Sequence, residues 1–318
     1  MKITNKTGLP EAIASYADYS ENHKYSSGGA DWSVTTLIDS PRIHNLLKKH
    51  GKDLTGDAVE SVFSMLGSAL HIIFEKGAVF DHITEERLFL TVDGKKISGQ
   101  IDTQEILPNG NIKIIDYKLT SVWAKIIDGG IKREWVCQQN MYAHLVEEAK
   151  GKKVDSINVC ILYRDWSKTE SLRRKDYPKY PIELIKLPLW SWKERNKFLI
   201  DRVAIHAEAR EMMERDDKLP LCTPSERWTR GGKVALMRDG REKAVKLFDS
   251  KAELMSYAQD NNLTSSTVPP PTGLRSGYSV VIRPETHVRC ESWCKVSRFC
   301  SQLKAEKVTA KLKQKEEA

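Results

Sequence analysis

The spacing of apolar residues along the chain predicts helices on both sides of a stretch of strands. In 57–77, DAVESVFSMLGSALHIIFEKG, apolar residues recur three to four positions apart, and this pattern predicts a buried helix. Further helical segments, recognised by apolar spacing or by start and stop signals, are predicted at 41–51, 133–151, 187–217 and 250–262. The first 30 residues show little apolar periodicity, so they are expected to be partly irregular.

Between the early helices and the middle of the chain, helical spacing gives way to strand-like runs. EERLFLTVDGKKISGQID, 85–102, holds two β-rich runs around Asp93-Gly94, which is a hairpin turn signal. TQEILPNGNIKIIDYK, 103–118, turns in the same way at Asn109-Gly110, and SINVCILYRDW, 156–166, predicts another strand. Helix, β-meander, helix, strand and helix in this order predict an α/β fold in which helices flank a mixed central sheet.

The chain changes character after Pro220. A hairpin signal at Asp239-Gly240, a Pro-, Ser- and Gly-rich stretch and the strand YSVVIRPE lead into a group of cysteines. The lysine-rich end lacks a broad apolar face and is expected to be a frayed or solvated helix. These changes predict a core with an N-terminal helical segment at 1–220, a cysteine-bearing α+β region with an inserted hairpin and helix at 221–303, and a basic tail at 304–318.

The composition is that of a globular chain with a basic balance. Of 318 residues, 40% are hydrophobic and 30% are charged, which excludes a disordered chain. The net charge of +8 and the pI of about 9.0 favour a polyanionic partner, of which nucleic acid is the commonest. No continuous apolar run approaches the roughly 18 residues of a membrane helix, and the start lacks the apolar region of a signal peptide. We therefore expect a cytoplasmic protein with no membrane partner.

The stretch IIDYKLTS, 114–121, ends an apolar strand in an acid and a lysine two residues apart. Because side chains alternate along a strand, Asp116 and Lys118 point to one face and Tyr117 to the other. The preceding hairpin can bring Asp102 near Asp116, and two adjacent carboxylates repel each other unless a cation relieves the repulsion. Mg²⁺ fits this need, and Lys118 beside it can orient a water or offset charge on a phosphate. An isolated pair of this kind is more often a solvated strand end.

Two predicted helices supply further polar residues. His71 follows Gly67 by one turn, where the glycine leaves room for another backbone to approach, and a neutral imidazole is a good metal ligand. Gln138 and Tyr142 are four residues apart, so they share a helix face and can hydrogen-bond phosphate or bases. Each feature alone is also typical of a core histidine or of helix surface, and it is their order along the chain that favours a site.

The motifs GSALH, GQID, IIDYK and QQNMY, in this order, resemble those of the PD-(D/E)xK nuclease superfamily, in its RecB-like and Cas4-like branch. The resemblance covers roughly residues 33–165, and it implies a restriction-endonuclease-like core. SVTTLIDSPR and YRDW are also similar to phage-type exonucleases of this branch. The chain departs from the name-giving motif at Ile101, which stands in place of proline, and at Asp116, which is Asp rather than Glu; both are common variants.

The resemblance also implies a role for each motif residue. His71, Asp102 and Asp116, with the carbonyl of Tyr117, are implied ligands of Mg²⁺ or Mn²⁺, and Lys118 is the implied catalytic lysine.

Further residues are implied around this centre. Gln138 and Tyr142 are implied to support the site and to contact DNA. Glu86, on the first strand of the meander, is a candidate for an additional acid, and so is Glu75, one turn past His71.

The chain has six cysteines, of which Cys137 and Cys160 fall in a predicted helix and a predicted strand and are expected in the core. The other four are grouped toward the end of the chain as Cys222, Cys290, Cys294 and Cys300. Without an export signal, clustered cysteines favour a metal over disulfides, and four thiolates suit a [4Fe–4S] cluster or a tetrahedral zinc ion.

The nuclease branch named above includes members with a four-cysteine iron–sulfur cluster, built from one distant and three clustered cysteines. This chain departs from them because Cys290 and Cys294 are one residue further apart and because Cys222 follows the nuclease motifs. The resemblance favours [4Fe–4S] as a structural staple, with zinc and no metal as the alternatives.

The function that these motifs imply is a metal-dependent deoxyribonuclease, an exonuclease in phage or bacterial DNA recombination, repair or degradation. The partner would be DNA, with a single-stranded end. The alternatives are a non-catalytic DNA-binding or assembly protein on a nuclease fold, and a zinc-stapled structural protein with a basic surface. No G-x4-G-K-[ST] motif occurs, so any unwinding is expected to come from a helicase or recombination partner.

Overall fold

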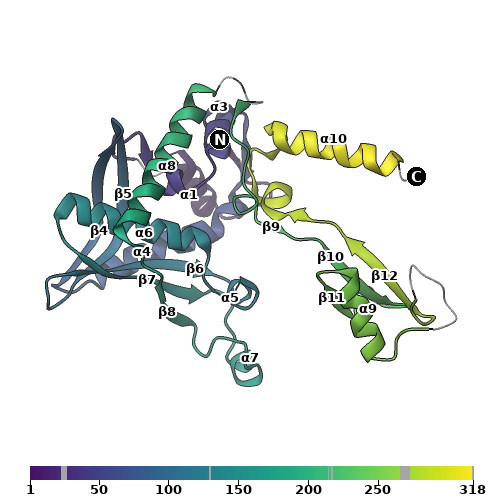
Figure 1. Ribbon diagram of the computed structural model, residues 1–318. Coiled ribbons are helices and arrows are strands. Elements are labelled where there is room, and N and C mark those ends of the chain that lie inside the picture. The colour runs from purple at the N-terminus through teal and green to yellow at the C-terminus, as the bar shows by residue number, and fades with distance from the viewer. Residues whose placement is uncertain (23–26, 129, 214, 216–217, 266–272, 317–318) are drawn as a thin grey trace. The chain divides into compact units, whose positions relative to one another are not determined.

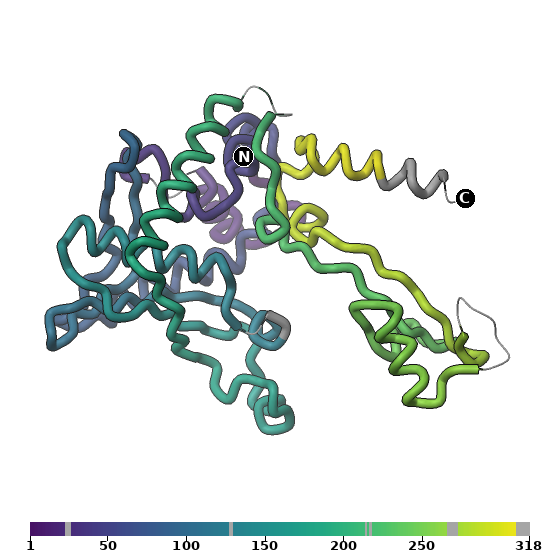
Figure 2. Tube along the Cα trace, in the orientation of Figure 1, coloured from purple at the N-terminus to yellow at the C-terminus, as the bar shows by residue number. Residues whose placement is uncertain are grey.

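The computed structural model describes the chain except for residues 23–26, 129, 214, 216–217, 266–272 and 317–318. Two compact units divide it: Met1–Leu221 together with Arg298–Ala318, and Cys222–Ser297. The first unit therefore contains both ends of the chain, which the colours of Figure 2 trace. Cys300 belongs to this first unit, and the other three cysteines of the late group belong to the second.

A mixed sheet forms the centre of the first unit, as the alternating runs predict (Figure 1). In the described residues its order is β2-β5-β6-β7-β8, with β4 paired to β5. The strands are β2 (Trp32–Ser33), β4 (His82–Val92), β5 (Lys95–Ile106), β6 (Ile112–Thr120), β7 (Val154–Tyr163) and β8 (Ile182–Leu187). β2 runs parallel to β5 and β6 runs parallel to β7, whereas the other neighbours are antiparallel. The predicted fold class, a mixed sheet flanked by helices, is confirmed.

Both predicted hairpin turns are present and have the backbone that their residues favour. Asp93 and Gly94 have φ angles of 47° and 71°, the left-handed conformation that a two-residue turn between β4 and β5 requires. Gly110, with φ of 79°, donates its amide to the carbonyl of Leu107 between β5 and β6. These turns set the register of β4, β5 and β6, and so decide which acids face one another.

Helices pack against this sheet and against one another. The described helices of the unit are α1 (Glu11–Asn22), α2 (Val34–Ile38), α3 (Pro41–His50), α4 (Val62–Lys76), α5 (Val122–Asp128), α6 (Arg133–Lys150), α7 (Lys168–Arg173), α8 (Trp192–Glu211) and α10 (Ser301–Glu316). α6 packs directly on β4, β5, β6 and β7, and α8 packs on α6, α2 and α3. The core between α6 and the sheet includes Ile97, Ile114, Met141 and Ile157, all fully buried. α1 shows that the expectation of an irregular start was only partly right.

The predicted helix at 57–77 forms, as α4 preceded by a short 3₁₀ turn, but it is not buried. α4 contacts β5 and β6, whereas Phe63, Leu66 and Ile73 are about half exposed. The helix carries apolar residues on more sides than the sheet covers, which its spacing alone did not show. The expected close backbone approach at Gly67 is also wrong, because a Cβ there would meet nothing within 4 Å.

One helix in the described part of the chain, Ala58–Lys76, is long and apolar enough to cross a membrane by length and composition. The prediction that no apolar run approaches the length of a membrane helix therefore does not hold for this segment by length and composition. A single such helix is weak evidence, because core helices pass the same test.

The second unit is built on a small sheet of its own. β10 (Lys233–Arg238) pairs with β11 (Lys246–Phe248) across the predicted turn at Asp239-Gly240 and with β12 (Tyr278–Arg283) on its other side. α9 (Lys251–Asp260) packs on this sheet through Leu254 and Ala258, which are fully buried. Part of the predicted Pro-, Ser- and Gly-rich stretch lies outside the described residues.

Candidate active site

The site lies where two strands of the central sheet separate. The ladder between β5 and β6 ends at the pair Thr103–Ile115, and the next residues along are Asp102 and Asp116. Beyond that point the amide of Tyr117 donates to Asp102 Oδ2 at 2.9 Å, so a carboxylate replaces the backbone acceptor of the ladder. The divergence of the strands makes room for both carboxylates on one side, as the sequence predicts.

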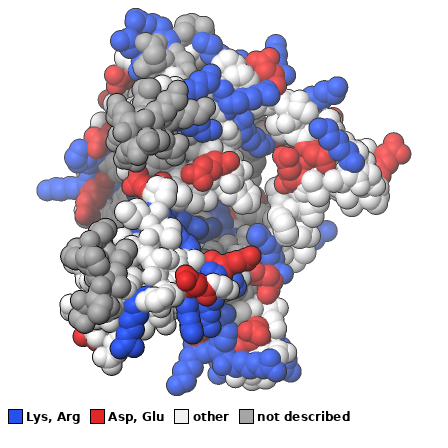
Figure 3. Space-filling model, turned by 90° about the vertical axis from the view of Figure 1, so that its right-hand side faces the viewer, with Lys and Arg blue, Asp and Glu red and all other residues white. Residues whose placement is uncertain are grey.

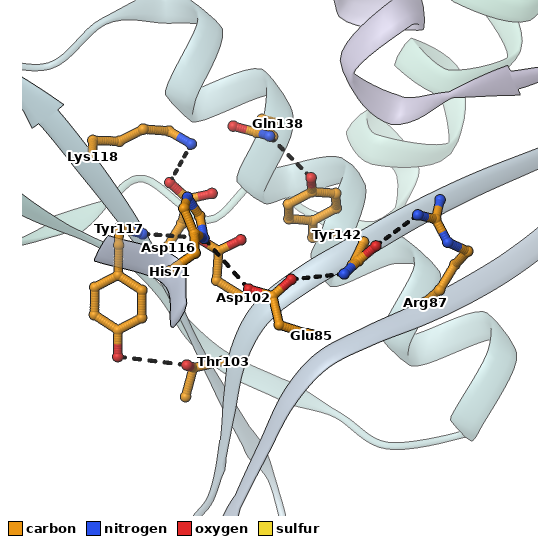
Figure 4. A network of polar contacts seen from close by, with 11 residues as sticks. His71, Glu85, Arg87, Asp102, Thr103, Asp116, Tyr117, Lys118, Gln138 and Tyr142 are labelled. Carbon is orange, nitrogen blue, oxygen red and sulfur yellow. Dashed lines mark hydrogen bonds and ion pairs between the residues drawn. The ribbon is translucent and has the colours of Figure 1, made fainter. Parts of the chain in front are cut away.

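Three side chains from three elements converge beside this point (Figure 4). His71 Nδ1 of α4 lies 3.4 Å from Glu85 Oε1 of β4 and 3.5 Å from Asp102 Oδ2 of β5. Among the described residues, this is the set of His, Cys, Asp or Glu side chains whose ligand atoms lie within 4.8 Å of one another. One nitrogen and two carboxylates at this spacing can hold a divalent cation.

Glu85 was not predicted from the sequence, which instead indicated its neighbour Glu86 as a candidate acid. Glu86 points elsewhere, where its carboxylate accepts from Lys150 and Gln104, both at 2.6 Å. Glu85 has a φ of 51°, a left-handed conformation that is uncommon for a residue other than glycine. The ladder of β4 with β5 pairs Thr84 with Thr103 and Glu86 with Ile101 and skips Glu85, so the regular alternation of side chains is interrupted at this residue.

Two further side chains hold Glu85 in place. Gln100 donates to Glu85 Oε2 at 2.7 Å and in turn accepts from Arg87 at 2.6 Å. Figure 4 shows this row of side chains running along β4 and β5 toward His71 and Asp102. The other oxygen of Glu85 is left to face His71, so the row fixes which way the carboxylate points.

Asp116 and Lys118 meet on one face of β6, as alternation predicts. Lys118 Nζ lies 2.6 Å from Asp116 Oδ2. Asp116 is 1% exposed, and neither of its oxygens accepts a hydrogen bond of good geometry from the described residues. A buried carboxylate with a single ion-pair contact has lone pairs to spare, and such lone pairs are what a cation uses.

The electrostatics of the site follow from its crowded acids. Burial, with the nearby Asp116 carboxylate, raises the pKa of Asp102 to about 7. The hydrogen bond between His71 and Glu85 raises the pKa of His71 and lowers that of Glu85. Burial alone would lower the pKa of Lys118, but the carboxylates of Asp116 and Asp102 outweigh it and raise that pKa. The negative charge at this point is therefore only partly compensated by the protein.

A cavity of about 660 Å³ gives access to these residues. His71, Glu85, Asp102, Asp116 and Lys118 all line it. The charged side chains in its wall suit a charged ligand.

The predicted helix pair is also at this cavity. Gln138 and Tyr142 of α6 line its wall, and Gln138 donates to the Tyr142 hydroxyl at 2.9 Å. α6 comes this close because Gly99 has no side chain; a Cβ there would lie 2.6 Å from Leu145 and 2.9 Å from Tyr142. The glycine of the GQID motif therefore positions Tyr142.

Two of the remaining candidates are less central. The ring of Tyr117 points away from the acids and stacks on Phe74 with centroids 4.2 Å apart, so only its backbone faces the site. Glu75 lines the cavity but is not part of the close set of ligand atoms.

The donor set fits a hard divalent cation. Asp102 and Glu85 offer carboxylate oxygens and His71 an imidazole nitrogen, which Mg²⁺ and Mn²⁺ accept. Asp116, which was also predicted as a ligand, lines the same cavity but lies outside this close set of ligand atoms. The spare lone pairs of Asp116 and the raised pKa of Asp102 both indicate negative charge that a cation would stabilise.

Three of the late cysteines, Cys222, Cys290 and Cys294, belong to the second unit. The pairing of β9 (Thr229–Arg230) with β13 (Thr286–His287) brings the chain after Cys222 beside the chain before Cys290. Arg227 donates to the Cys290 sulfur at 3.5 Å. The sulfurs of a tetrahedral zinc site would lie about 3.8 Å apart. Within the described residues of the second unit, Cys222, Cys290 and Cys294 do not come within 4.8 Å of one another as a set.

Comparisons with known proteins give distant structural likenesses alone. No family description and no curated protein matches the chain in sequence. The crystal structure of SSO0001 is similar at 17% identity and a TM-score of 0.41, over 61% of this chain and 84% of that one. The alkaline exonuclease LHK-Exo from Laribacter hongkongensis is similar at 14% identity and a TM-score of 0.29, over 48% and 70%.

A structure of LHK-Exo in complex with dAMP is similar at the same identity, 14%, and the same TM-score, 0.29, over 59% of this chain and 97% of that one. All these TM-scores are below 0.5, so the likenesses are too partial to argue from. What the site can do therefore rests on its own residues.

Proposed function

We propose that this chain is a divalent-metal-dependent deoxyribonuclease that hydrolyses DNA phosphodiester bonds. The observation that supports it is the convergence of His71, Glu85, Asp102, Asp116 and Lys118 on one open cavity, with the carboxylate of Asp116 buried and short of hydrogen bonds. A non-catalytic DNA-binding protein would have no use for this arrangement, because partly uncompensated buried acids lower stability and repel a phosphate backbone.

The residues of the cavity divide the work between them. His71, Glu85, Asp102 and Asp116 would hold Mg²⁺ or Mn²⁺. When bound, such a cation acts as a Lewis acid that stabilises charge on the phosphate and makes water a better nucleophile. Lys118 keeps a positive charge within reach of the same point, where it can orient the phosphate or offset its developing charge.

Gln138 and Tyr142 would complete the wall against which DNA rests. They are joined by a hydrogen bond and line the same cavity as the acids of the strands. In the same proposal the enzyme is an exonuclease of phage or bacterial DNA recombination, repair or degradation. It would act in the cytoplasm on DNA with a single-stranded end, alongside a helicase or recombination partner.

The decisive experiment incubates end-labelled single- and double-stranded DNA with the protein in Mg²⁺, Mn²⁺ or EDTA. Lys118→Ala is expected to lower cleavage about 100- to 1,000-fold, because it removes one preorganised cation from the transition state. Lys113→Ala is the matched control, since Lys113 is on the same strand but pairs with Glu105 at 2.7 Å. Lys118→Arg keeps the charge next to Asp116 and provides a second variant if Lys118→Ala unfolds.

Two results would refute the proposal. One is the absence of cleavage by the wild-type protein with either metal. The other is wild-type cleavage by folded Lys118→Ala, judged by thermal unfolding in the same buffer.

The cysteines carry a separate proposal, a [4Fe–4S] cluster held by Cys222, Cys290, Cys294 and Cys300. The pairing of β9 with β13, which brings the segments of Cys222 and Cys290 together, supports it. Iron with acid-labile sulfide in protein purified without oxygen would support the cluster, and zinc alone would replace it by a zinc staple.

A further inference from the structure

We propose that the basic lobe, defined as α5 together with residues 164–181, binds the single-stranded segment of DNA that leads to the cavity. The proposal deepens the proposed nuclease function by assigning its substrate a second contact surface. None of the residues that were implied as site residues lies in this lobe.

Net charge alone does not locate such a surface. On the face drawn in Figure 3, Lys and Arg side chains are interspersed with Asp and Glu rather than gathered in one stripe. The sequence RDWSKTESLRRKDYPKYP of 164–181 is different, because it has six basic and three acidic residues. A local excess of this kind is what attracts a phosphate backbone.

Internal contacts engage three acids in and beside the lobe, and two of these contacts are ion pairs. Asp165 Oδ1 accepts the amide of Val122 at 2.7 Å and so caps the start of α5. Asp176 pairs with Arg174 at 2.7 Å. Glu183, on the neighbouring strand β8, accepts from Lys125 at 2.9 Å.

Several cations of the lobe are left available by these contacts. Among the described residues of the lobe, the exposed cationic side chains that form no ion pair with an acid are those of Arg164, Lys168, Arg173, Lys175 and Lys179. Lys168, Lys175 and Lys179 line one or both of two adjoining hollows of about 320 Å³ and 560 Å³, which share Lys175, Tyr177, Lys179 and Tyr180 in their walls. Cations around a hollow can contact successive phosphates of one strand.

Aromatic rings among these cations favour a single strand over a duplex. Trp123 is 55% exposed and Tyr180 is 60% exposed. Arg174 lies 5.6 Å from the centre of the Trp123 ring, and Lys179 lies 5.4 Å from that of Tyr180. An exposed ring beside a cation offers a stacking surface for a base and a charge for its phosphate. Only unpaired bases expose the faces that stack in this way.

The lobe is held together by its own hydrogen bonds, so its surface exists before a ligand arrives. The Trp166 ring nitrogen donates to the carbonyl of Pro178 at 2.9 Å. The Tyr177 hydroxyl accepts the amide of Ser167 at 2.9 Å and donates to the carbonyl of Asp165 at 3.3 Å. A preformed surface loses less conformational entropy on binding than a floppy charged loop would.

The lobe also lies within a few nucleotides of the cavity. α5 starts at Val122, four residues past Lys118, and a strand advances about 3.3 Å per residue. Arg164 follows β7 directly, and its amide donates to the carbonyl of Thr120 at 2.9 Å. About four stacked nucleotides of a strand, at about 3.4 Å each, would cover this distance.

α4 links the two surfaces from the other side. Arg164 lies over the ring of Phe63, 4.3 Å from its centre, in the first turn of α4. His71 and Ile72, further along the same helix, line the cavity. The exposed apolar residues of α4 between these points offer bases a path from the lobe to the acids.

The test measures binding of a fluorescent single-stranded oligonucleotide in EDTA, so that cleavage does not interfere. The lobe variant replaces four cations by alanine at Lys168, Arg173, Lys175 and Lys179. The control variant removes the same charge from the same unit, at exposed lysines outside the lobe: Lys48, Lys52, Lys152 and Lys193. Both variants are checked for folding by thermal unfolding.

The lobe variant is expected to bind about tenfold or more weakly at 0.1 M salt, whereas the control changes affinity less than about threefold. Loss of four phosphate contacts would lower the slope of log K against log salt by about 3. Trp123→Ala is expected to weaken binding of the single strand severalfold and to leave binding of a blunt duplex unchanged.

Equal losses in the lobe and control variants would overturn the proposal, because they would show a general effect of net charge. Equal loss by Trp123→Ala for duplex and single strand would overturn the single-strand assignment. These results are independent of the nuclease proposal. A wild-type protein that binds through the lobe but cleaves nothing would refute the nuclease alone, and a lobe variant that binds and cleaves normally would refute the lobe alone.

Discussion

The cavity and the basic lobe differ in the sign of the charge that the protein leaves uncompensated. In the cavity, carboxylates of Asp102, Asp116 and Glu85 are gathered on one side, and the protein supplies too few partners for them. In the lobe, internal contacts engage three acids in and beside it, and several cations remain exposed. Where a fold leaves charge of one sign uncompensated, a ligand of the opposite charge is expected to bind. The cavity fits a cation and the lobe fits a phosphate backbone, and a metal-dependent nuclease has need of both.

The largest expected difference between the two regions comes from removing one acid from each. Asp116→Asn is expected to lower DNA cleavage about a thousandfold or more, because it removes a carboxylate from the proposed metal site. Asp176→Asn only releases Arg174, so cleavage is expected to stay within about twofold and binding of single-stranded DNA to become slightly tighter. Initial cleavage rates and binding titrations measure both. Similar losses in the two variants would remove the distinction between the regions.

The neighbouring acids Glu85 and Glu86 sharpen the boundary of the cavity. Glu85→Gln is expected to lower cleavage about 10- to 100-fold at limiting Mg²⁺, and excess metal should recover part of the loss. Glu86→Gln is the matched control, since it alters a contact with Lys150 outside the cavity and should leave cleavage unchanged. The measurement is the rate as a function of Mg²⁺ concentration. A larger effect of Glu86→Gln than of Glu85→Gln would show that Glu86, and not Glu85, is the metal ligand on β4.

The smallest expected effect is on stability without metal. The pKa of Asp102 is about 7 in the folded protein against 3.8 for the ordinary group, so between these values the folded state keeps a proton that the unfolded chain releases. Its contribution to stability therefore falls as pH rises from about 4 to 7. The raised pKa of His71 acts in the same direction, and Asp116, Lys118 and His71 are the charged groups that face Asp102.

Melting temperatures in EDTA from pH 5 to pH 8 test this linkage. The melting temperature of the wild type is expected to fall as pH rises, by roughly 2–4 °C for each kcal/mol of stability lost. The melting temperature of Asp102→Asn should lack the part of this pH dependence that Asp102 contributes. His206 provides a contrast, because burial lowers its pKa to about 4 and so removes stability as pH falls from about 6.5 to 4. Identical pH profiles for the wild type and Asp102→Asn would contradict the assigned pKa.

Much of the sheet could be predicted because its signals are local. The turns at Asp93-Gly94 and Asn109-Gly110 need backbone angles that few other residues adopt, and they set the register of β4 to β6. The common face of Asp116 and Lys118 follows from strand alternation alone. By contrast, β8 was not predicted, because as an edge strand it buries only its last residue, Leu187.

The errors arose where tertiary contacts decide. The apolar spacing of α4 is real, but which of its residues meet the sheet depends on how β5 and β6 place it. Glu85 was passed over for Glu86 because the left-handed backbone at Glu85 interrupts the alternation of β4, and the sequence carries no signal for that interruption. A close approach was predicted at Gly67 of α4, but it occurs at Gly99, where α6 packs on β5. Which glycine is used in this way depends on tertiary packing, which a local sequence pattern does not show.

The left-handed backbone at Glu85 places two demands on one position. The conformation would cost glycine nothing and costs a residue with a Cβ about 1–2 kcal/mol, whereas the cavity needs a carboxylate that glycine lacks. Glu85→Gly would therefore relieve the backbone at this position and remove a carboxylate from the proposed metal site. A search for thermostable variants that did not measure activity could select this substitution. At residue 85, relief of backbone strain and retention of the carboxylate therefore favour different amino acids.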